Sequence, residues 1–243
     1  MVKIFSDIEQ MNFFAAENFV GIADYAINRR GRFTVALSGG STPKSLFRLL
    51  TSEKFSSRID WSKTFFFFGD ERNVLPDNTE SNFRMASENL FQTLKIADEN
   101  IFCWQTELGD AEKIAEDYER KIIEFFNLKN SNLPRFDLIL LGMGADGHTA
   151  SLFPFSPALF ETEKIAVANP VEKLNTTRLT LTFPVINNAA NIIFLVSGAE
   201  KAAALKEILE GKRKPEKFPA QNVQPKNGNL LWLLDEKSAA LLG

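Results

Sequence analysis

The feature that most constrains the fold is a set of five short apolar segments interspersed with stretches of helical periodicity. The segments are rich in β-branched and aromatic residues and span residues 33–37, 64–68, 136–141, 192–196 and 230–234. Continuous apolar runs of this length are typical of strands buried on both faces of a sheet. Helical patterns cover residues 8–28, 43–50, 80–94, 111–126 and 199–209. This alternation predicts an α/β fold with a Rossmann-like, mostly parallel sheet flanked by helices.

The domain organisation follows from what the sequence lacks. Residues 165–183, with IAVA and RLTLTF, indicate two further extended segments. No Pro/Gly/Ser-rich linker, low-complexity tract or internal repeat marks a boundary. The chain has 243 residues, of which 44% are hydrophobic, which is enough apolar material for a full core. We therefore expect one α/β domain over residues 1–243.

Charge and residue counts argue against several kinds of partner. The net charge of -3 argues against nucleic acid, because proteins that bind it usually carry a basic excess. The N-terminal MVKIFSDIEQ carries charges where a secretory signal would be apolar, and no stretch approaches the roughly 18 apolar residues of a membrane span. We expect a cytoplasmic protein with no membrane partner and no obligate protein partner.

Metal and thiol chemistry are disfavoured by the same counts. The chain has one cysteine, Cys103, and one histidine, His148, too few for the usual zinc clusters. Cys103 stands among apolar neighbours, so we expect it to be buried and inert. The counts therefore argue against structural or catalytic zinc, whereas a Mg²⁺ site made of carboxylates alone stays open, although nothing in the sequence resembles a dedicated acidic cluster.

Four of the five apolar segments run directly into polar turns that contain glycine. The turns read LSGGSTP, FGDERN, LGMGADGH and VSGAEK. In open α/β sheets ligands bind beyond the carboxyl ends of the strands, so we expect the turns to converge on one crevice. Glycine suits any strand-to-helix turn for conformational reasons. That simpler explanation is adequate for one turn, but four turns with charged or hydroxyl groups favour a shared site.

The first turn is a candidate phosphate site. Gly39 and Gly40 allow the backbone to approach a ligand closely. Ser41 or Thr42 is expected to be the N-cap of the following helix, with Pro43 at its first position. Backbone N–H groups and the helix dipole bind phosphate at such a terminus. A capping role alone is the alternative, and the two roles are compatible.

The second turn places Asp70, Glu71 and Arg72 at the end of a strand of phenylalanines. Burying such a triplet is costly unless its members pair, so an ion pair of Arg72 with Asp70 or Glu71 is one interpretation. In the other, the guanidinium binds phosphate or stabilises an oxyanion. Two further basic residues, Arg178 and Lys201, could contribute to an anion pocket, although each taken singly is more often a solvated charge.

The third turn carries Asp146 and His148. A lone histidine is usually a packed or surface residue, but this one follows a glycine-rich turn at a strand end. A neutral imidazole, with an ordinary pKa of about 6.5, is a competent base near neutral pH. Asp146 or Asp70 could orient it, and the sequence does not choose between them. No GxSxG pentapeptide occurs, so attack by water is preferred to acyl-enzyme chemistry.

At these blocks the sequence resembles the 6-phosphogluconolactonases. The similarity runs from LSGGSTP through GDERNVLPDNTESNF, LGMGADGHTASLFP, RLTLTFP and VSGAEKA to FPAQNVQPKNGNLLWLLD. The resemblance implies hydrolysis of 6-phospho-D-glucono-1,5-lactone to 6-phospho-D-gluconate in the oxidative pentose phosphate pathway, without metal or cofactor. It also implies a fold similar to glucosamine-6-phosphate deaminase and ribose-5-phosphate isomerase.

The resemblance also assigns roles to residues. His148 matches the family's general base, and Arg72 matches an arginine near the reacting carboxyl or phosphate group. Gly39 to Thr42 match phosphate-binding positions, whereas Arg178 and Lys201 match basic positions of the family.

Two alternatives stay open at the level of sequence. Deaminases and isomerases of sugar phosphates share similar turns, but the deaminases carry a catalytic glutamate where this chain has Phe153, which disfavours deamination. A sugar-phosphate-binding regulator without activity is the second alternative, and the intact surroundings of His148 argue against it. Asn73, after GDER, departs from the family's usual apolar or small residue.

Overall fold

The centre of the molecule is a six-stranded sheet in which all neighbouring strands are parallel. A computed structural model describes residues 1–129 and 132–243. The strand order is β1-β9-β8-β5-β2-β3. The predicted α/β fold with a mostly parallel sheet is confirmed. The strands are β1 (Val2–Phe5), β2 (Phe33–Leu37), β3 (Thr64–Phe68), β5 (Leu138–Leu141), β8 (Asn191–Val196) and β9 (Asn229–Asp235).

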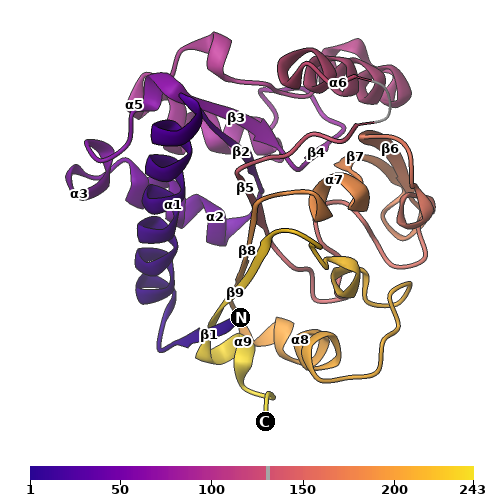
Figure 1. The fold of residues 1–243 in the computed structure, drawn as a ribbon. Helices are drawn as coiled ribbons and strands as arrows, with labels where there is room; N and C mark the ends of the chain where they lie inside the picture. The colour runs from indigo at the N-terminus through magenta and orange to yellow at the C-terminus, as the bar shows by residue number, and fades with distance from the viewer. Residues whose placement is uncertain (130–131) are drawn as a thin grey trace.

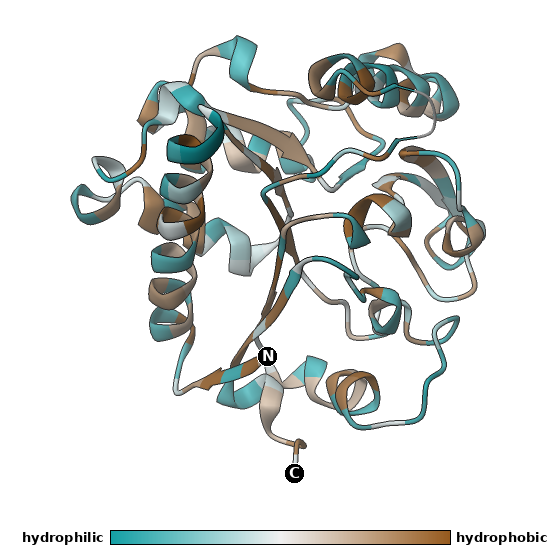
Figure 2. Cartoon of the chain, viewed as in Figure 1, coloured by the Kyte–Doolittle hydropathy of each residue, from teal (hydrophilic) through white to brown (hydrophobic). Residues whose placement is uncertain are grey.

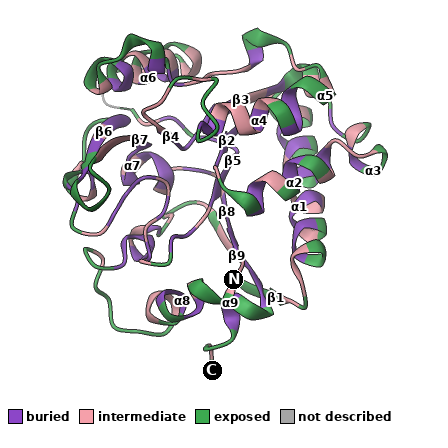
Figure 3. Ribbon diagram, turned by 180° about the vertical axis from the view of Figure 1, so that it is seen from behind, coloured by how far each residue is buried: buried purple, intermediate pink, exposed green. Residues whose placement is uncertain are grey.

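Helices cover both faces of this sheet (Figure 1). On one side lie α1 (Ile8–Arg30) and α2 (Ser41–Leu50), and on the other lie α6 (Ala111–Phe126), α7 (Phe183–Asn187) and α8 (Ala202–Leu209). Short helices α3 (Glu53–Ser56) and α9 (Glu236–Ala239) complete the helical layers. Hydrophobic strands run between helices with hydrophilic outer faces (Figure 2), and the central strands are buried whereas the outer helix faces are exposed (Figure 3).

The chain order of the strands creates a crevice. From β2 the chain moves outward to β3, and it then returns to the other side of β2 to form β5, β8 and β9. The carboxyl ends of β2 and β5 therefore flank a topological switch point, where open α/β sheets bind ligands.

A second, antiparallel sheet of three strands lies beside the first, in the order β4-β7-β6. Its strands are β4 (Asp70–Arg72), β7 (Thr176–Leu181) and β6 (Ala166–Val171). The two extended segments predicted within residues 165–183 are thus present. The prediction of a turn at Asp70–Arg72 is wrong, because after Gly69 these residues pair with β7, placing Arg72 opposite Arg178.

Two helix predictions need correction. The N-cap of α2 is Gly40, with φ of 106°, and neither Ser41 nor Thr42. Gly40 can adopt this left-handed backbone at no steric cost. The helix therefore begins at Ser41, and Pro43 is its third residue and not its first. The helical pattern over residues 80–94 forms three consecutive pieces, which are α4 (Asn82–Ala86), a π-helical turn (Ser87–Phe91) and α5 (Gln92–Leu94). Ser81 is the N-cap of α4.

The core is one contiguous cluster of buried apolar side chains that includes residues of both sheets, such as Leu140 of β5 and Leu179 of β7. Aromatic rings fill much of it: Phe67 stacks on Phe102 with centroids 4.5 Å apart. Among the described residues, no helix combines the length and the apolar character that crossing a membrane requires.

Candidate functional site

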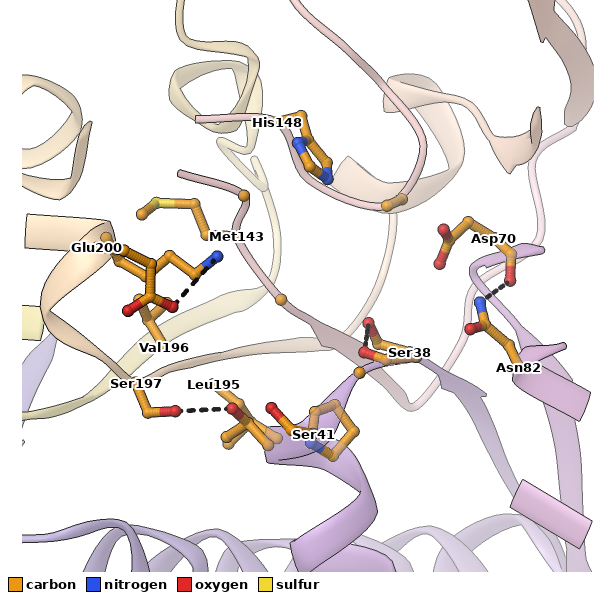
Figure 4. Close-up of a pocket in the computed structure, with 18 of the residues that line it drawn as sticks. Ser38, Ser41, Asp70, Asn82, Met143, His148, Leu195, Val196, Ser197 and Glu200 are labelled. Atoms are coloured by element: carbon orange, nitrogen blue, oxygen red, sulfur yellow. Dashed lines mark hydrogen bonds and ion pairs between the residues drawn. The ribbon is translucent and has the colours of Figure 1, made fainter. Parts of the chain in front are cut away.

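A cleft opens at the carboxyl ends of the central strands. It consists of a cavity of about 290 Å³ and an adjoining cavity of about 410 Å³ that share Asp70, Arg72, His148 and Ala150. Figure 4 shows Ser41, Asp70 and His148 facing the same space from different elements. The structure therefore brings every predicted site residue to one cleft. Gly39, Gly40, Ser41, Thr42 and Lys201 line the first cavity, and Asp146 and Arg178 line the second.

One end of the cleft is the N-terminus of α2. The first N–H groups of a helix have no partner within the helix, and here they belong to residues that line the cavity. The Thr42 hydroxyl lies 2.8 Å from the Ser197 hydroxyl, at the end of β8. The positive end of the helix dipole and a pair of hydroxyl groups thus meet at the cavity wall, an arrangement suited to an anion.

Gly39 allows a close contact that sequence reasoning did not identify. A Cβ at this position would lie 1.8 Å from Oδ1 of Asn82. Asn82 is buried, lines the cavity and donates from Nδ2 to the Asp70 carbonyl at 2.9 Å. Its Oδ1 is buried and has no hydrogen-bond partner among the residues that the structure describes. The only sequence signal for Asn82 was its place in the block GDERNVLPDNTESNF. A buried acceptor without a partner, next to the loop of residues 39–42, is suited to a ligand that donates a hydrogen bond.

His148 is held by Asp146, which answers the question that the sequence left open. Its Nδ1 lies 2.5 Å from Asp146 Oδ1, and its backbone N–H donates to the same oxygen at 3.1 Å. An ionised carboxylate only accepts, so Nδ1 carries the proton and Nε2 keeps a free lone pair. A Cβ on Gly144 would lie 2.0 Å from Nδ1, so the glycine-rich turn creates the space that the ring occupies. Asp70 instead accepts a hydrogen bond from Ser151 at 2.8 Å.

The imidazole is neutral over most of the pH range. Burial is the main cause that lowers the pKa of His148 to about 4. The nearby cations Lys201, Arg178 and Arg72 lower it further, while Asp70 opposes them. A ring that resists protonation while its free nitrogen faces the cleft (Figure 4) can accept a proton from a ligand or a water molecule.

Two arginines lie side by side in the small sheet. Arg72 and Arg178 are paired in register across β4 and β7. Burial, followed by the charge of Arg72, lowers the pKa of Arg178. The Arg178 Nε is buried and finds no hydrogen-bond partner within the described part of the chain. Two adjacent guanidinium groups repel each other, so the pair favours an anion that contacts both.

Neither expected ion pair of Arg72 forms among the residues that the structure describes. The Arg72 guanidinium donates to the Glu80 carbonyl. Buried Glu71 instead accepts from the backbone N–H groups of Asn82 at 2.7 Å and Phe83 at 2.8 Å. Burial nevertheless raises the pKa of Glu71. Glu71 therefore anchors the start of α4 to β4 and leaves the guanidinium near the cleft.

Lys201 closes the other side of the first cavity, near Glu200. The two side chains approach to 3.8 Å, with Glu200 largely exposed (Figure 4). Cys103 lies away from the cleft, packs partly buried against the core, and has its thiol pKa raised by burial. In the described part of the chain, no three His, Cys, Asp or Glu side chains are grouped so as to hold a metal ion.

Two contacts beside the histidine were not predicted from the sequence, in which Phe153 was singled out only as the position where the deaminases carry a glutamate. Phe153 stacks on His148, with ring centroids 4.1 Å apart and planes inclined by 26°. Lys173 comes from the turn between β6 and β7 and forms an ion pair with Asp146 Oδ2. No local pattern predicts the Lys173 contact, because it depends on how the small sheet packs against the loop after β5.

The chain is similar to known proteins over most of its length. The family profile described as glucosamine-6-phosphate isomerases/6-phosphogluconolactonase matches residues 6–232. A 6-phosphogluconolactonase from Synechocystis sp. is 44% identical over 214 residues, which cover 88% of this chain and 86% of the relative. The solved 6-phosphogluconolactonase from Trypanosoma brucei has a TM-score of 0.89 at 31% identity and covers 100% of this chain and 98% of its own.

A monomeric glucosamine-6-phosphate deaminase has a TM-score of 0.81 at 21% identity, covering 99% of both chains. Identity this low shows the shared fold alone. The predicted similarity of fold to the deaminases is thereby confirmed, and the similarity to ribose-5-phosphate isomerase stays a prediction.

Proposed function

The chain belongs to the family of glucosamine-6-phosphate isomerases and 6-phosphogluconolactonases, and from this premise we propose that it hydrolyses 6-phospho-D-glucono-1,5-lactone to 6-phospho-D-gluconate. Relatives over most of the chain carry the lactonase name. The reaction belongs to the oxidative pentose phosphate pathway. The observation that carries the proposal is a neutral imidazole, fixed by Asp146, in the same cleft as an anion-binding helix terminus.

The phosphate of the substrate binds at Gly39 to Thr42. The N–H groups and dipole of α2 supply the attraction, and Lys201 or the paired arginines add a cation. Binding holds the lactone ring against His148, so the attack of water becomes effectively intramolecular.

His148 then acts as the general base. Water adds to C1 while its proton moves to Nε2, and a tetrahedral intermediate with an oxyanion forms. The bond between C1 and the ring oxygen breaks, and the imidazolium returns the proton to that oxygen. Asp146 accepts from Nδ1 throughout and stabilises the charged ring. Arg72 and Arg178 stabilise the oxyanion or the carboxylate that replaces it.

Deamination of glucosamine 6-phosphate is the competing activity within the family. The position at which the deaminases carry a catalytic glutamate is Phe153, whose ring stacks on His148 and cannot transfer a proton. Turnover of the lactone without ammonia release from glucosamine 6-phosphate is therefore expected.

The decisive experiment measures acid release from freshly generated lactone by the wild type and His148→Asn. After subtraction of spontaneous ring opening, the variant is expected to lose about 10²-fold or more in kcat with little change in KM. Product identity is checked by enzymatic oxidation of 6-phosphogluconate. Retention of most activity would remove His148 as the base. Binding of a sugar phosphate without turnover by the wild type would instead support a regulator.

A further inference from the structure

We infer that Lys173 is a positioning residue that fixes the tautomer of His148 through Asp146. The two oxygens of the Asp146 carboxylate are divided between them: Oδ1 lies 2.5 Å from His148 Nδ1, and Oδ2 forms the ion pair with Lys173 Nζ. A carboxylate held at both oxygens cannot rotate away from the ring. Lys173 itself lies in the turn between β6 and β7, and it lines the adjoining cavity of about 410 Å³ and not the cavity at the helix terminus.

A second contact connects Lys173 to His148 indirectly, through Phe153. Its Nζ lies 5.0 Å from the centroid of Phe153, within the range of a cation–π interaction. The Phe153 ring also stacks on His148, with ring centroids 4.1 Å apart. Asp146 and Phe153 therefore both connect Lys173 to the imidazole, one through its edge and one through its face.

The charged groups around the His148 ring explain why the position of Asp146 matters. Asp70 and Arg72 from β4, Arg178 from β7 and Lys201 before α8 all act on His148. Both Asp146 and Asp70 are carboxylates that could accept from the imidazole, and Asp70 is on the cleft side. If Asp146 rotated away, Nε2 could carry the proton and donate toward the cleft. The base would then be lost without any change in the residues that bind the substrate.

The ion pair between Lys173 and Asp146 is expected to matter more for the position of His148 than for the stability of the fold. About half of the Lys173 side chain is exposed, and pairs of this kind contribute little to folding free energy. Lys173 fixes the orientation of the Asp146 carboxylate. Removal of Lys173 is therefore expected to change the tautomer of His148 more than the stability of the fold.

The single histidine makes the test direct. Wild type, Lys173→Met and Lys173→Arg are labelled with ¹⁵N, and the ring nitrogen shifts of His148 are recorded at neutral pH. The wild type and Lys173→Arg are expected to carry the proton on Nδ1, whereas Lys173→Met is expected to show a mixture of both tautomers. In the lactone assay, kcat of Lys173→Met should fall about tenfold with KM changed less than twofold, and Lys173→Arg should recover most of it.

Lys217→Met is the matched control, since Lys217 also lies over an aromatic ring, Phe218 at 5.4 Å, and has no ion pair within the described residues. It should leave both readouts unchanged. Unchanged nitrogen shifts in Lys173→Met would overturn the inference, as would a raised KM with normal kcat, which indicates substrate binding by Lys173. The kinetic readout rests on the proposed function, but the nitrogen shifts do not, so absence of lactone turnover in the wild type leaves the inference testable.

Discussion

At the scale of single residues, the surroundings of His148 lower its pKa from the ordinary value of about 6.5 to about 4. The ring is enclosed by Gly144 on one side and Phe153 on another, and three cations face it. Burial of the ring and the three cations disfavour the imidazolium, whereas Asp70 favours it. The residue is consequently a base that stays available well below neutral pH.

The pH dependence of the reaction tests this point. Because the free enzyme has a His148 pKa of about 4, the base is unprotonated above that pH and is lost as the pH falls through it. We expect kcat/KM to decline only near pH 4, and not near the ordinary value of about 6.5. A bound phosphate dianion favours the imidazolium, so the acidic limb of kcat should lie at higher pH. Circular dichroism at each pH separates titration from unfolding; a limb of kcat/KM near 6.5 would contradict the enclosed site.

The arginine of β4 gives a second prediction at this scale. Arg72→Lys keeps the charge but removes the planar fork that can contact two oxygens. We expect kcat/KM to fall about tenfold or more in the lactone assay. Arg84→Lys, on α4 and paired with Glu88, is the control and should behave as the wild type. Near-normal kinetics of Arg72→Lys would show that the guanidinium is only structural.

At the scale of elements, the loop between β2 and α2 depends on the absence of a side chain at Gly39. In Gly39→Ala the new Cβ would overlap Asn82, so we expect a raised KM and a loss of about 1–3 kcal/mol in the free energy of unfolding. Urea unfolding and initial rates measure the two effects. Adding Asn82→Ala should relieve part of the cost.

Gly21→Ala in α1 is the matched control, because its Cβ meets nothing within 4 Å. It should leave KM unchanged and stabilise the helix by roughly 0.5–1 kcal/mol. If Gly39→Ala likewise leaves KM unchanged and does not destabilise the protein, Asn82 does not pack closely against Gly39.

The elements also show what a sequence can and cannot specify. The buried runs that became β2, β3, β5, β8 and β9 were recognisable because strands covered on both faces need continuous apolar residues. The strand at Asp70–Arg72 was not, since three charged residues form a strand here only because β7 supplies the pairing. Similarly, His148 and Arg72 stood out in their turns, whereas Asn82 and Lys173 reach the site only through tertiary packing.

At the scale of the whole molecule, the two sheets share one core, and we propose that the chain is a single domain. Leu140 and Leu179 belong to the same buried cluster, so neither sheet can lose its packing alone. We expect one cooperative transition, with coincident curves from far-UV circular dichroism, tryptophan fluorescence and the His148 ring signals. A calorimetric enthalpy that exceeds the van't Hoff enthalpy would instead indicate two folding units.

The loop that bears His148 is fastened to the small sheet, since Ser151 donates to Asp70 at 2.8 Å and Asn169 donates to the Ser151 carbonyl at 2.8 Å. The helix terminus at Gly40 follows β2 of the large sheet, and the loop of His148 also begins at a strand of that sheet, β5. Gly69 joins the two sheets, since its N–H donates to the Leu37 carbonyl at 2.8 Å and its own carbonyl accepts from the Leu181 N–H at 2.9 Å. The distance between the helix terminus and His148 is therefore fixed from both sheets, and a ligand that contacts both ends must match it.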